Sequence, residues 1–431
     1  MACVVECAPV TSTFTGPVIK NTVVPNGFPL PATSYVLDPL KGAFDLGSMI
    51  RYLDHSDAYG GAEWGHPSDN IGAILPIADW LSRTGEIPLK MRDVLEAIIK
   101  AYEIQGVFQA KNAFNKLGID HVLLVKVAST AVVSKLFGLT RQQANAAVSQ
   151  AFVDGHPLRI YRQSPNTSPR KGWAAGDACM RAVHLVFMTK SGQPGFPTAL
   201  TAPKWGFYDA LFRGQQFVLP RPFTSSVIET VFFKLYAAEG HGISAVEAAV
   251  TLSKLLEGRL DEIESLQIRT QQAAMIIIDK RGPLYNAADR DHCMRYMIAV
   301  TLLKGDWPDV QDYEDASPYA SSADVEALRQ KITMEEDLEM TKDYHDPKTG
   351  KVASGLTVTM KDGSASGEVL VERPVGHPWR EDTIELVAQK FVRLTSSLLK
   401  EPRTVWERIM SDSFEQEDVK DWVDLFSLKE S

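Results

Sequence analysis

The sequence predicts a mainly α-helical protein, with a large helical domain and a smaller α/β domain. Apolar residues recur with helical spacing across residues 46–258, whereas short stretches of residues 259–376 alternate apolar and polar side chains. The helical spacing then returns, so we expect residues 377–431 to form helices that pack back on the helical domain. Frequent prolines in residues 1–45 predict an irregular N-terminal arm.

Several helices of the larger domain have recognisable faces or ends. Apolar side chains share one face of residues 91–105, and the apolar stretch Leu123–Phe137 ends before Gly138, a residue type that commonly follows a helix. Thr140 with a glutamine three residues later is typical of a capping box that opens the next helix. Ala245–Leu256 is predicted to be another amphipathic helix.

The smaller domain is predicted from its strands. Residues 265–270 and 356–360 alternate apolar and polar side chains, as half-buried strands do. Asp362-Gly363 is a hairpin signal, and Glu368–Glu372 is the expected returning strand. Asp324–Ile332 has the pattern of a helix between these strands, which completes a small α/β domain.

Composition limits the classes of function. The chain has 431 residues, of which 45% are hydrophobic and 23% charged, as is usual for a globular protein. Its formal net charge is −9 and its sequence pI is about 5.6, which argues against general nucleic-acid binding. An anionic substrate therefore requires a local basic pocket, because the protein as a whole repels it.

The cysteines and the hydrophobic runs give further expectations. Cys3 and Cys7 lie in the arm, Cys179 and Cys293 are isolated, and there is no CxxC pair, so we expect no structural zinc and no iron–sulfur cluster. The candidate acids, bases and cations described below lack metal-ligand spacing, so we expect no cofactor. No apolar run reaches the ~18 residues of a membrane span. The first twenty residues lack the features of a secretion signal and contain no arginine. We expect an intracellular protein, cytoplasmic rather than mitochondrial.

The segment Arg51–Asn70 contains the densest group of candidate catalytic residues. Asp54 and Asp57 are three residues apart and would share one face if they lay on a helix. Glu63 and His66 follow close behind, beside glycines that allow a ligand to approach the backbone. These residue types predict proton-transfer chemistry. The alternative is a solvated polar loop.

Four cations between residues 159 and 171 form a second candidate group. Arginine binds carboxylate or phosphate with two parallel hydrogen bonds, and lysine acts as a point charge. The group therefore predicts an anion clamp, with a solvated basic loop as the alternative. Its members are Arg159, Arg162, Arg170 and Lys171.

Other candidates are single residues near apolar segments. His121 stands at the mouth of an apolar helix, where it is either a ligand or a satisfied structural histidine. Lys234 follows three apolar residues, so we expect it to be buried and to need an anionic partner. His241 follows seven residues later and is not assigned a role. His292 and Tyr296 would face together on a helix, or simply mark a charged helix start.

Several segments together resemble the MmgE/PrpD family. They are AEWGHPSDN, GIDHVLLVKVASTAVV, RKGWAAGDA, ALTAPKWGFYDALF, DRDHCMRYM and DYHDP, and the resemblance covers residues 22–431 approximately. It implies a large all-helical domain, a smaller α/β lid domain with the active site between the two, a homodimer, and no iron–sulfur cluster. The family's reactions are the dehydration of 2-methylcitrate and, in a related branch, the decarboxylation of cis-aconitate.

The resemblance also implies roles for individual residues. Asp54 and His66 match acid/base or substrate-binding positions, and His121 resembles a pocket residue of the decarboxylase branch. We expect Asp54, His66 and His121 to transfer protons, without assigning which of them is the base. The residues that match or adjoin the substrate-binding positions are Lys171, Lys234, Arg170 and Tyr296.

One departure from the family pattern concerns pocket size. The family usually reads Asp-Thr-Trp-Leu-Ala-Ala before Glu-Trp-Gly-His, whereas this chain has Ala58, Gly60 and Gly61 at the second, fourth and fifth positions. We interpret these smaller residues as enlarging the substrate pocket for a longer alkyl chain, with neutral drift in a loop as the alternative. Each buried methylene contributes roughly 0.8 kcal/mol to binding.

These observations predict a cofactor-independent hydro-lyase that dehydrates a 2-alkylcitrate, either 2-methylcitrate or a longer homologue, to the alkyl-cis-aconitate. Such activities occur in fungal secondary metabolism leading to maleic anhydrides. The expected partner is a small-molecule tricarboxylate, with no nucleic acid and no membrane. The alternatives are an aconitate-type decarboxylase, an isomerase or epimerase, and a catalytically impaired homologue that still binds tricarboxylates.

Overall fold

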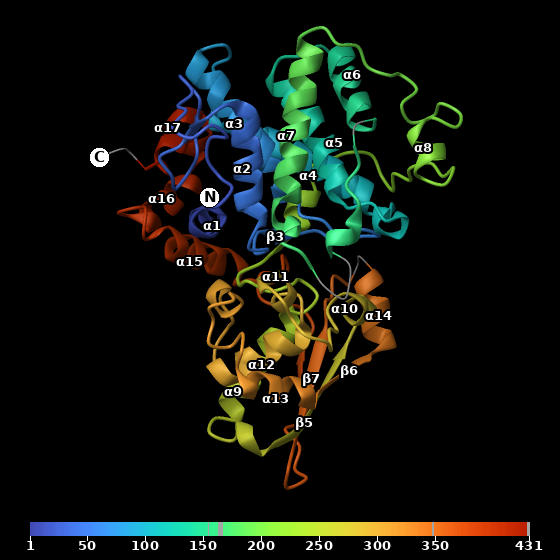
Figure 1. Cartoon of the computed structure of the whole chain (residues 1–431), viewed down its shortest axis with the longest axis vertical. Coiled ribbons are helices and arrows are strands. Elements are labelled where there is room, and N and C mark those ends of the chain that lie inside the picture. Colours follow the sequence, from blue (N-terminus) through green and yellow to red (C-terminus); the bar gives the residue numbers. More distant parts are fainter. Residues whose placement is uncertain (154, 163–166, 347–348, 429–431) are drawn as a thin grey trace. The chain divides into compact units, whose positions relative to one another are not determined.

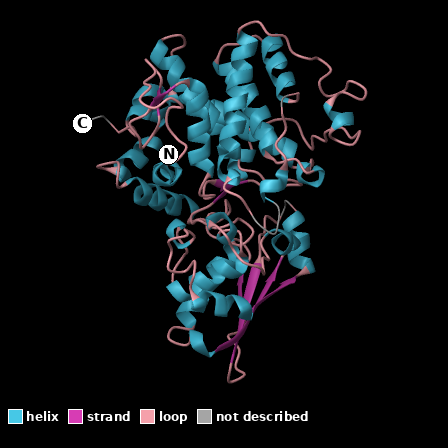
Figure 2. Ribbon diagram, in the orientation of Figure 1, coloured by secondary structure: helices cyan, strands magenta, loops and turns pink. Residues whose placement is uncertain are grey.

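The computed structural model describes residues 1–153, 155–162, 167–346 and 349–428, which divide into two compact units (Figure 1). The first unit comprises Met1–Arg159, Gly172–Phe232 and Glu385–Ser431, and the second comprises Ile160–Lys171 and Phe233–Ile384. Helices dominate the first unit, and the larger sheet lies in the second (Figure 2). The second unit thus starts at Phe233, ahead of the change of sequence pattern near residue 259.

The first unit is built from helices and two-residue strands. The antiparallel pair β1 (Phe28–Pro29) and β2 (Val36–Leu37) precedes the second helix, and β3 (Asp57–Ala58) follows it. The helices are α1 (Ala2–Thr11), α2 (Pro39–Arg51), α3 (Ile71–Thr84), α4 (Met91–Gln109), α5 (Val122–Leu136), α6 (Arg141–Ala151), α7 (Arg170–Lys190), α8 (Phe207–Ala210), α15 (Thr383–Thr395), α16 (Pro402–Ile409) and α17 (Val419–Asp424). The first two residues of α7 and of α15 are grouped with the second unit.

Local sequence signals explain several helix ends. The Asp38 side chain accepts hydrogen bonds from the Leu40 and Lys41 amides and so begins α2. The predicted capping box at α6 is confirmed, because Thr140 Oγ1 accepts from the Gln143 amide at 3.3 Å and Gln143 Oε1 accepts from the Thr140 amide at 3.0 Å. Gly138 follows α5 with a φ of +69°, as its position predicts.

Helix α1 corrects the expectation of an irregular arm. Residues 2–11 are helical even though Pro9 lies within them. Val4 and Cys7 are buried as α1 packs against α2. Burial of this face stabilises the helix, and tertiary packing thereby outweighs the prolines that the sequence pattern emphasises.

Three helices of the first unit meet at glycines. A Cβ atom on Gly72 of α3 would lie 2.5 Å from Gly47 Cα of α2, and one on Gly47 would lie 2.9 Å from Gly176 Cα of α7. Real Cβ atoms do not approach other atoms so closely. Helices α2, α3 and α7 therefore pack backbone against backbone, which only glycine permits.

A phenylalanine-rich core fills another part of the first unit. Phe114 and Phe212 have ring centroids 5.4 Å apart, and Phe152 meets Phe207 edge to face at 5.5 Å. The apolar face of α5 contributes Leu123, Leu124 and Val127 to the same cluster. Aromatic burial and the preferred edge-to-face geometry both stabilise this part of the unit.

The second unit contains a four-stranded sheet in the order β6-β5-β7-β8. Strand β5 (Ile263–Thr270) is parallel to β6 (Ile332–Glu336) and antiparallel to β7 (Ser354–Met360), which pairs with β8 (Val369–Val371). The chain passes from the first unit to the second within β4 (Phe232–Phe233). The second unit also contains α9 (Ile243–Leu255), α10 (Gln272–Ile277), α11 (Ala287–Arg290), α12 (Met294–Lys304), α13 (Ala323–Lys331) and α14 (Leu338–His345). In Figure 1, α9, α12 and α13 lie together beside this sheet.

The strand and helix predictions for the smaller domain are confirmed. Ile268 of β5 pairs with Leu356 of β7, and both side chains are fully buried. Val358 is buried on the same side as Leu356, as the two-residue alternation requires. Gly363 has a φ of +85° in the turn before β8, which explains the Asp-Gly signal.

Candidate active site

Arg51 and Asp54 form a buried ion pair directly after α2. Arg51 Nη1 donates to Asp54 Oδ1, and the side chains are only 2% and 3% exposed. Asp54 has a φ of +54°, a left-handed conformation that aspartate tolerates better than most residues. Since α2 ends at Arg51, Asp54 and Asp57 do not lie on one helix, and the expected shared helical face is wrong. The turn itself directs Asp54 at the guanidinium.

His66 is held by two hydrogen bonds that define its tautomer. Arg51 Nη2 lies 2.9 Å from His66 Nε2, and because arginine only donates, Nε2 accepts. On the other side of the ring, His66 Nδ1 donates to the main-chain oxygen of Asp57. His66 is therefore a neutral imidazole with its Nε2 lone pair directed at Arg51, and Asp54 Oδ1 lies 3.9 Å from the same nitrogen.

The Asp57 carboxyl plays a structural role. Its carboxylate accepts from the Ser68 amide and, at 2.6 Å, from Ser68 Oγ. Burial raises the pKa of the Asp57 carboxyl, although Ser68 and Tyr102 act in the opposite direction. Asp57 thereby fixes the segment that carries His66, and it is the second acid of the dense motif.

His121 lies beside His66. The two ring centroids are 5.6 Å apart. His121 is 3% exposed at the start of α5, and its Nδ1 lies 3.4 Å from Asp120 Oδ1. Arg51, Asp54, His66 and His121 together form what we name the first cluster. It combines two imidazoles, a carboxylate and a guanidinium in a buried part of the first unit.

The positions expected to enlarge the pocket have local packing roles. Ala58 is 1% exposed, whereas Gly60 and Gly61 are exposed. A Cβ on Gly61 would lie 2.8 Å from Ala110 Cα and Gln109 O, so backbone approach requires glycine here. A Cβ on Gly60 would meet the Trp64 ring at 3.1 Å. Gly60 and Gly61 therefore have local packing reasons for their small size, and the enlarged pocket stays a prediction.

In the second unit, Lys171 lies near an acid and an imidazole. Lys171 Nζ is 3.5 Å from Asp291 Oδ2 and 3.4 Å from His292 Nδ1, and Asp291 also bonds His292 Nδ1. The lysine side chain is 2% exposed. Lys171 is thus a buried cation whose charge is matched by Asp291.

Glu239 and His241 lie in the turn before α9. Glu239 Oε1 accepts from His241 Nδ1 at 2.8 Å, and His241 Nε2 lies 2.9 Å from the Tyr344 hydroxyl of α14. Burial alone would raise the pKa of Glu239, but His241, His292 and Lys234 outweigh it and lower the pKa to about 2. The buried Lys234 thus belongs to the same electrostatic group. We name Lys171, Lys234, Glu239, His241, Asp291 and His292 the second cluster.

Arg170 and Tyr296 have different surroundings. The guanidinium of Arg170 lies 5.4 Å from the centre of the Tyr161 ring, a cation–π contact. The Tyr296 hydroxyl donates to the main-chain oxygen of Asp312 at 2.9 Å, and burial raises the pKa of Tyr296 to about 12. Because α12 starts at Met294, His292 precedes the helix and the predicted pairing of His292 with Tyr296 on one helical face is wrong.

Arg51, Glu239 and Asp291 of these clusters, and Tyr344 beside His241, were not predicted as site residues. Arg51 is the first residue of the segment Arg51–Asn70. Its place at the end of an amphipathic helix is the signal that could have identified it as a site residue. Glu239 stands two residues before His241, a spacing that carries little information. Tyr344 lies far away in sequence, within the DYHDP motif, whose Pro347 lies outside the described residues. Pro165, within the basic segment, is also outside them.

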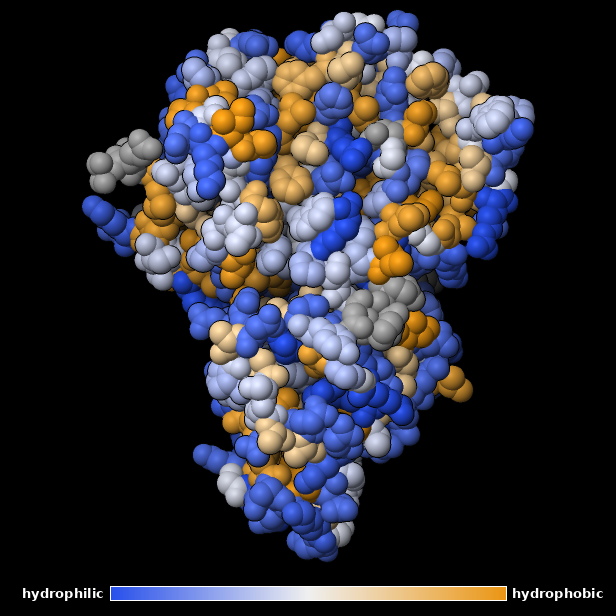
Figure 3. Space-filling model, in the orientation of Figure 1, coloured by the Kyte–Doolittle hydropathy of each residue, from blue (hydrophilic) through white to orange (hydrophobic). Residues whose placement is uncertain are grey.

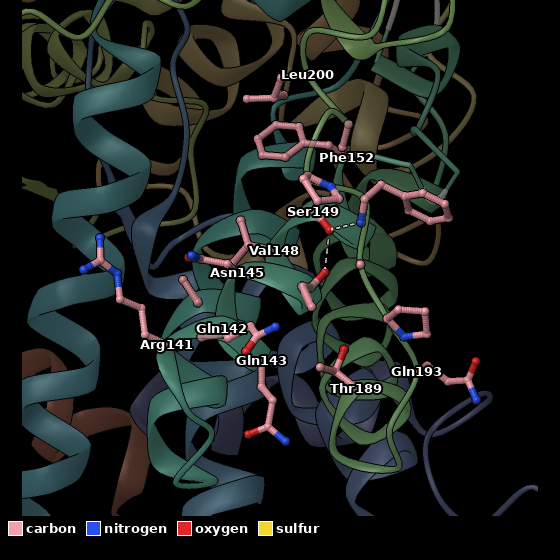
Figure 4. Close-up of a pocket in the computed structure, with 18 of the residues that line it drawn as sticks. Arg141, Gln142, Gln143, Asn145, Val148, Ser149, Phe152, Thr189, Gln193 and Leu200 are labelled. Carbon is pink, nitrogen blue, oxygen red and sulfur yellow. Dashed lines mark hydrogen bonds between the residues drawn. The ribbon is translucent and has the colours of Figure 1, made fainter.

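A groove of ≈ 1250 Å³ lies elsewhere in the first unit. Figure 4 shows Gln142, Asn145 and Ser149 of α6 along it, with Thr189 and Gln193 from the end of α7 and beyond. Its described lining contains none of the residues of either cluster. Figure 3 shows apolar and hydrophilic residues interspersed on the visible faces of both units.

Two further features of the described part of the chain concern metal binding and membrane insertion. No three histidine, cysteine, aspartate or glutamate side chains there are grouped so that they could hold a metal ion. No described helix has both the length and the apolar character needed to cross a membrane.

Comparison with known proteins assigns the chain to a family. The MmgE/PrpD N-terminal domain matches residues 5–220, and the MmgE/PrpD C-terminal domain matches residues 236–416. The chain is 56% identical over 435 residues to a 2-methylcitrate dehydratase-like protein of Aspergillus oryzae, covering 98% of this chain and 88% of that protein.

Two more relatives are similarly close. An alkylcitrate dehydratase of a fungal species is 52% identical over 389 residues, covering 88% of this chain and 77% of the relative. The 2-methylcitrate dehydratase of Salmonella typhimurium is 49% identical over 426 residues, covering 95% and 87%. With both domains matched and the mainly α, two-domain architecture confirmed, this chain belongs to the MmgE/PrpD family.

Proposed function

We propose that the chain is a hydro-lyase that removes water from a 2-alkylcitrate to give the alkyl-cis-aconitate. The observation that carries this proposal is similarity along nearly the whole chain to relatives named for this reaction, at 56%, 52% and 49% identity. The first cluster supports it, because it provides groups for proton transfer next to a carboxylate-binding cation.

In the first cluster, we assign the base from the tautomer of His66. A substrate carboxylate that binds Arg51 replaces His66 as the acceptor for Nη2, which leaves the Nε2 lone pair ready to take the proton alpha to that carboxylate. The imidazolium that forms then lies beside Asp54, whose Oδ1 is 3.9 Å from Nε2 in the structure. Asp54 thus stabilises the charge that develops on the base.

The departing hydroxyl also needs a proton. His121 is the second imidazole of the first cluster, with its ring centroid 5.6 Å from that of His66. We assign it to protonate the leaving oxygen, so that the C–H proton goes to His66 and the C–O bond breaks with release of water. Two separate groups then perform the two transfers.

Lys171 and Lys234 of the second cluster are assigned to the carboxylates of the substrate. Both are buried beside acids, Asp291 and Glu239, which keep their charges compensated before substrate binds. Arg170 and Tyr296 stay proposed substrate-binding residues. Tyr296 must exchange its bond to Asp312 to take that role, since its hydroxyl already donates there.

The preferred substituent is proposed to be longer than methyl. One fungal relative, which is named an alkylcitrate dehydratase, supports this. Of the residues that depart from the family pattern, Ala58 is buried, with only 1% of its surface exposed.

The test is turnover of a series of 2-alkylcitrates, from methyl to octyl, read by mass spectrometry for loss of one water. We expect kcat/KM to rise from methyl to hexyl. His66→Gln is the matched control, because glutamine still accepts a hydrogen bond from Arg51 but cannot take a proton from the substrate. Preference for the methyl compound contradicts the longer substituent, and release of carbon dioxide instead of water contradicts the dehydration.

We further propose that the chain acts as a homodimer, as the family resemblance implies. Light scattering during size-exclusion chromatography measures the mass directly. A mass of 47.6 kDa, that of a single chain, contradicts the proposal.

A further inference from the structure

A further group of ionisable side chains lies next to Asp54 and belongs to neither of the two clusters named above. Cys3 Sγ donates to the main-chain oxygen of His55 at 3.6 Å, and Lys390 Nζ donates to the same oxygen. His55 Nε2 lies 3.0 Å from Glu6 Oε2. We name Cys3, Glu6, His55 and Lys390 the Cys3 cluster. It joins α1, the turn after α2, and α15 within the first unit.

The cluster has the composition of an activated thiol. An ammonium and an imidazole stand beside the sulfur, and a carboxylate partners the imidazole, as in sites that favour thiolate. Burial would raise the pKa of Cys3, but Lys390 and His55 outweigh it and lower the pKa to about 6. His55 is 3% exposed and Lys390 8%, whereas Cys3 as a residue is partly exposed.

The other cysteines have the opposite environment. Cys7, Cys179 and Cys293 are buried, and burial raises the pKa of each thiol. Cys7 lies one helical turn after Cys3 on α1, which makes it a matched control within the same element. Reactivity in this chain should therefore be confined to one of four chemically identical side chains.

We propose that Cys3 is a site of covalent modification by small electrophiles, and that modification there lowers the activity of the first cluster through His55. The link is the backbone. The oxygen that Cys3 and Lys390 both bind belongs to His55, and the residue before it is Asp54, held at a φ of +54°. Alkylation removes the thiolate charge beside Lys390 and adds bulk next to the His55 oxygen, which disturbs the Lys390 hydrogen bond that anchors the turn directing Asp54 at Arg51.

Iodoacetamide is the probe that tests this. The Cys3 thiolate attacks the methylene carbon, an S–C bond forms, the C–I bond breaks and iodide leaves, with no net oxidation or reduction. The thiol proton has already passed to solvent. The low pKa also makes the sulfur a weaker nucleophile, so the informative quantity is the pH at which half the maximal rate is reached.

The first measurement is the rate of labelling at each cysteine of the full chain, by peptide mass spectrometry between pH 5 and 9. We expect Cys3 to label with a midpoint near pH 6, against roughly 8.5 for an ordinary thiol. The ionisable groups around Cys3 are the terminal amine and, on α1, Glu6 and Cys7, together with His55 and, on α15, Lys390 and Arg393. Lys390→Met should move the midpoint upward by at least one pH unit.

The second measurement is dehydratase activity after labelling. Of the two measurements, only this one rests on the proposed function. Wild type should lose at least tenfold in kcat as Cys3 is labelled. Cys3→Ser removes the sulfur that iodoacetamide attacks and keeps a small polar side chain, so it should retain activity through the same treatment. Cys7→Ala should behave as wild type.

The reactivity of Cys3 and its effect on activity can each be contradicted without the other. A wild-type midpoint above pH 8, or labelling of Cys293 as fast as Cys3, overturns the modification site whatever the enzyme's substrate. Labelled Cys3 with unchanged kcat overturns the coupling to Asp54. If no alkylcitrate is turned over, the proposed function fails, and the labelling midpoint still decides whether Cys3 is the reactive thiol.

Discussion

At the scale of single residues, the buried pair of Arg51 and Asp54 gives the first cluster its charge. Arg51 also donates to His66 Nε2 at 2.9 Å, so one guanidinium orders both the carboxylate and the imidazole. Such a residue contributes in two ways. It compensates a buried acid, and it is the group that exchanges its partner when an anionic substrate binds.

Replacing Asp54 tests its role in catalysis. Asp54→Asn keeps the shape but removes the charge that stabilises a protonated His66, so we expect kcat to fall by roughly 10²–10⁴. Asp57→Asn is the control, because burial already raises the pKa of that carboxyl and its partner is Ser68. Steady-state kinetics at pH 7 compares them, and equal losses in both variants would show that Asp54 has no special part in the reaction.

Arg51→Lys separates substrate binding from chemistry. Lysine keeps the positive charge beside Asp54 but cannot contact two partners with a planar fork. We expect KM to rise about tenfold, with a smaller change in kcat, since the lost contact holds a carboxylate in ground and transition states alike. An unchanged KM would mean that Arg51 does not bind substrate.

At the scale of elements, Arg83 joins α3 to α17. It bonds Asp79 of its own helix at 2.7 Å and Asp424 of α17 at 2.6 Å. The Asp79 side chain is fully buried whereas that of Asp424 is half exposed. The two ends of the pair therefore contribute very differently, because solvent screens the outer contact.

Asp79 makes stability depend on pH. Burial raises its pKa to about 6, despite Arg83, from 3.8. The folded state thus holds this proton more tightly, and the resulting stability is fully present below pH 3.8 and lost as pH rises through 6. Asp79→Asn should remove this loss, on the order of 3 kcal/mol by the pKa difference.

Urea unfolding at pH 4 and pH 8 measures that change. Asp424→Asn serves as the control, since a half-exposed partner contributes about 1 kcal/mol or less. If Asp79→Asn keeps the wild-type difference between the two pH values, another group causes the pH dependence.

The elements that the sequence predicts correctly are those whose signals are local. The capping residues of α6 and the alternation of β5 and β7 act within a few residues, and both were found. Helix α1 was missed because its stability comes from packing against α2. The end of α2 at Arg51 was missed too, and the helical face expected for Asp54 and Asp57 was wrong for that reason.

The clusters show the same limit. His66 and His121 were predicted as site residues from the dense motif and the family resemblance, and the structure brings their rings together. Glu239 and Tyr344 are separated by more than a hundred residues, and only the fold unites them through His241. Long-range hydrogen bonds of this kind have no counterpart in local sequence pattern.

At the scale of the whole molecule, each unit has a core of its own. Phe114 belongs to the aromatic cluster of the first unit, and Leu356 to the sheet of the second, and both are fully buried. A compact unit with its own core behaves as a domain. The unfolding of the chain should therefore not follow a single two-state transition.

Calorimetry with two core variants tests this. Phe114→Ala should cost about 3–5 kcal/mol and Leu356→Ala about 2–5 kcal/mol, each lowering the transition of its own unit. Each variant controls for general destabilisation in the other, because both truncate a buried apolar side chain to alanine, but in different units. One transition that both variants lower equally would show that the units unfold together.

The meeting of α2, α3 and α7 at Gly47, Gly72 and Gly176 has a consequence for how this family can diverge. Most damaging core substitutions can be rescued when a neighbour becomes smaller. Here the neighbour that a new methyl group meets is itself a glycine backbone, at 2.5 Å for Gly72 and 2.9 Å for Gly47, and nothing smaller exists. A deep mutational scan with second-site selection should therefore find no suppressors among these three positions, which leaves each helix dependent on the other two.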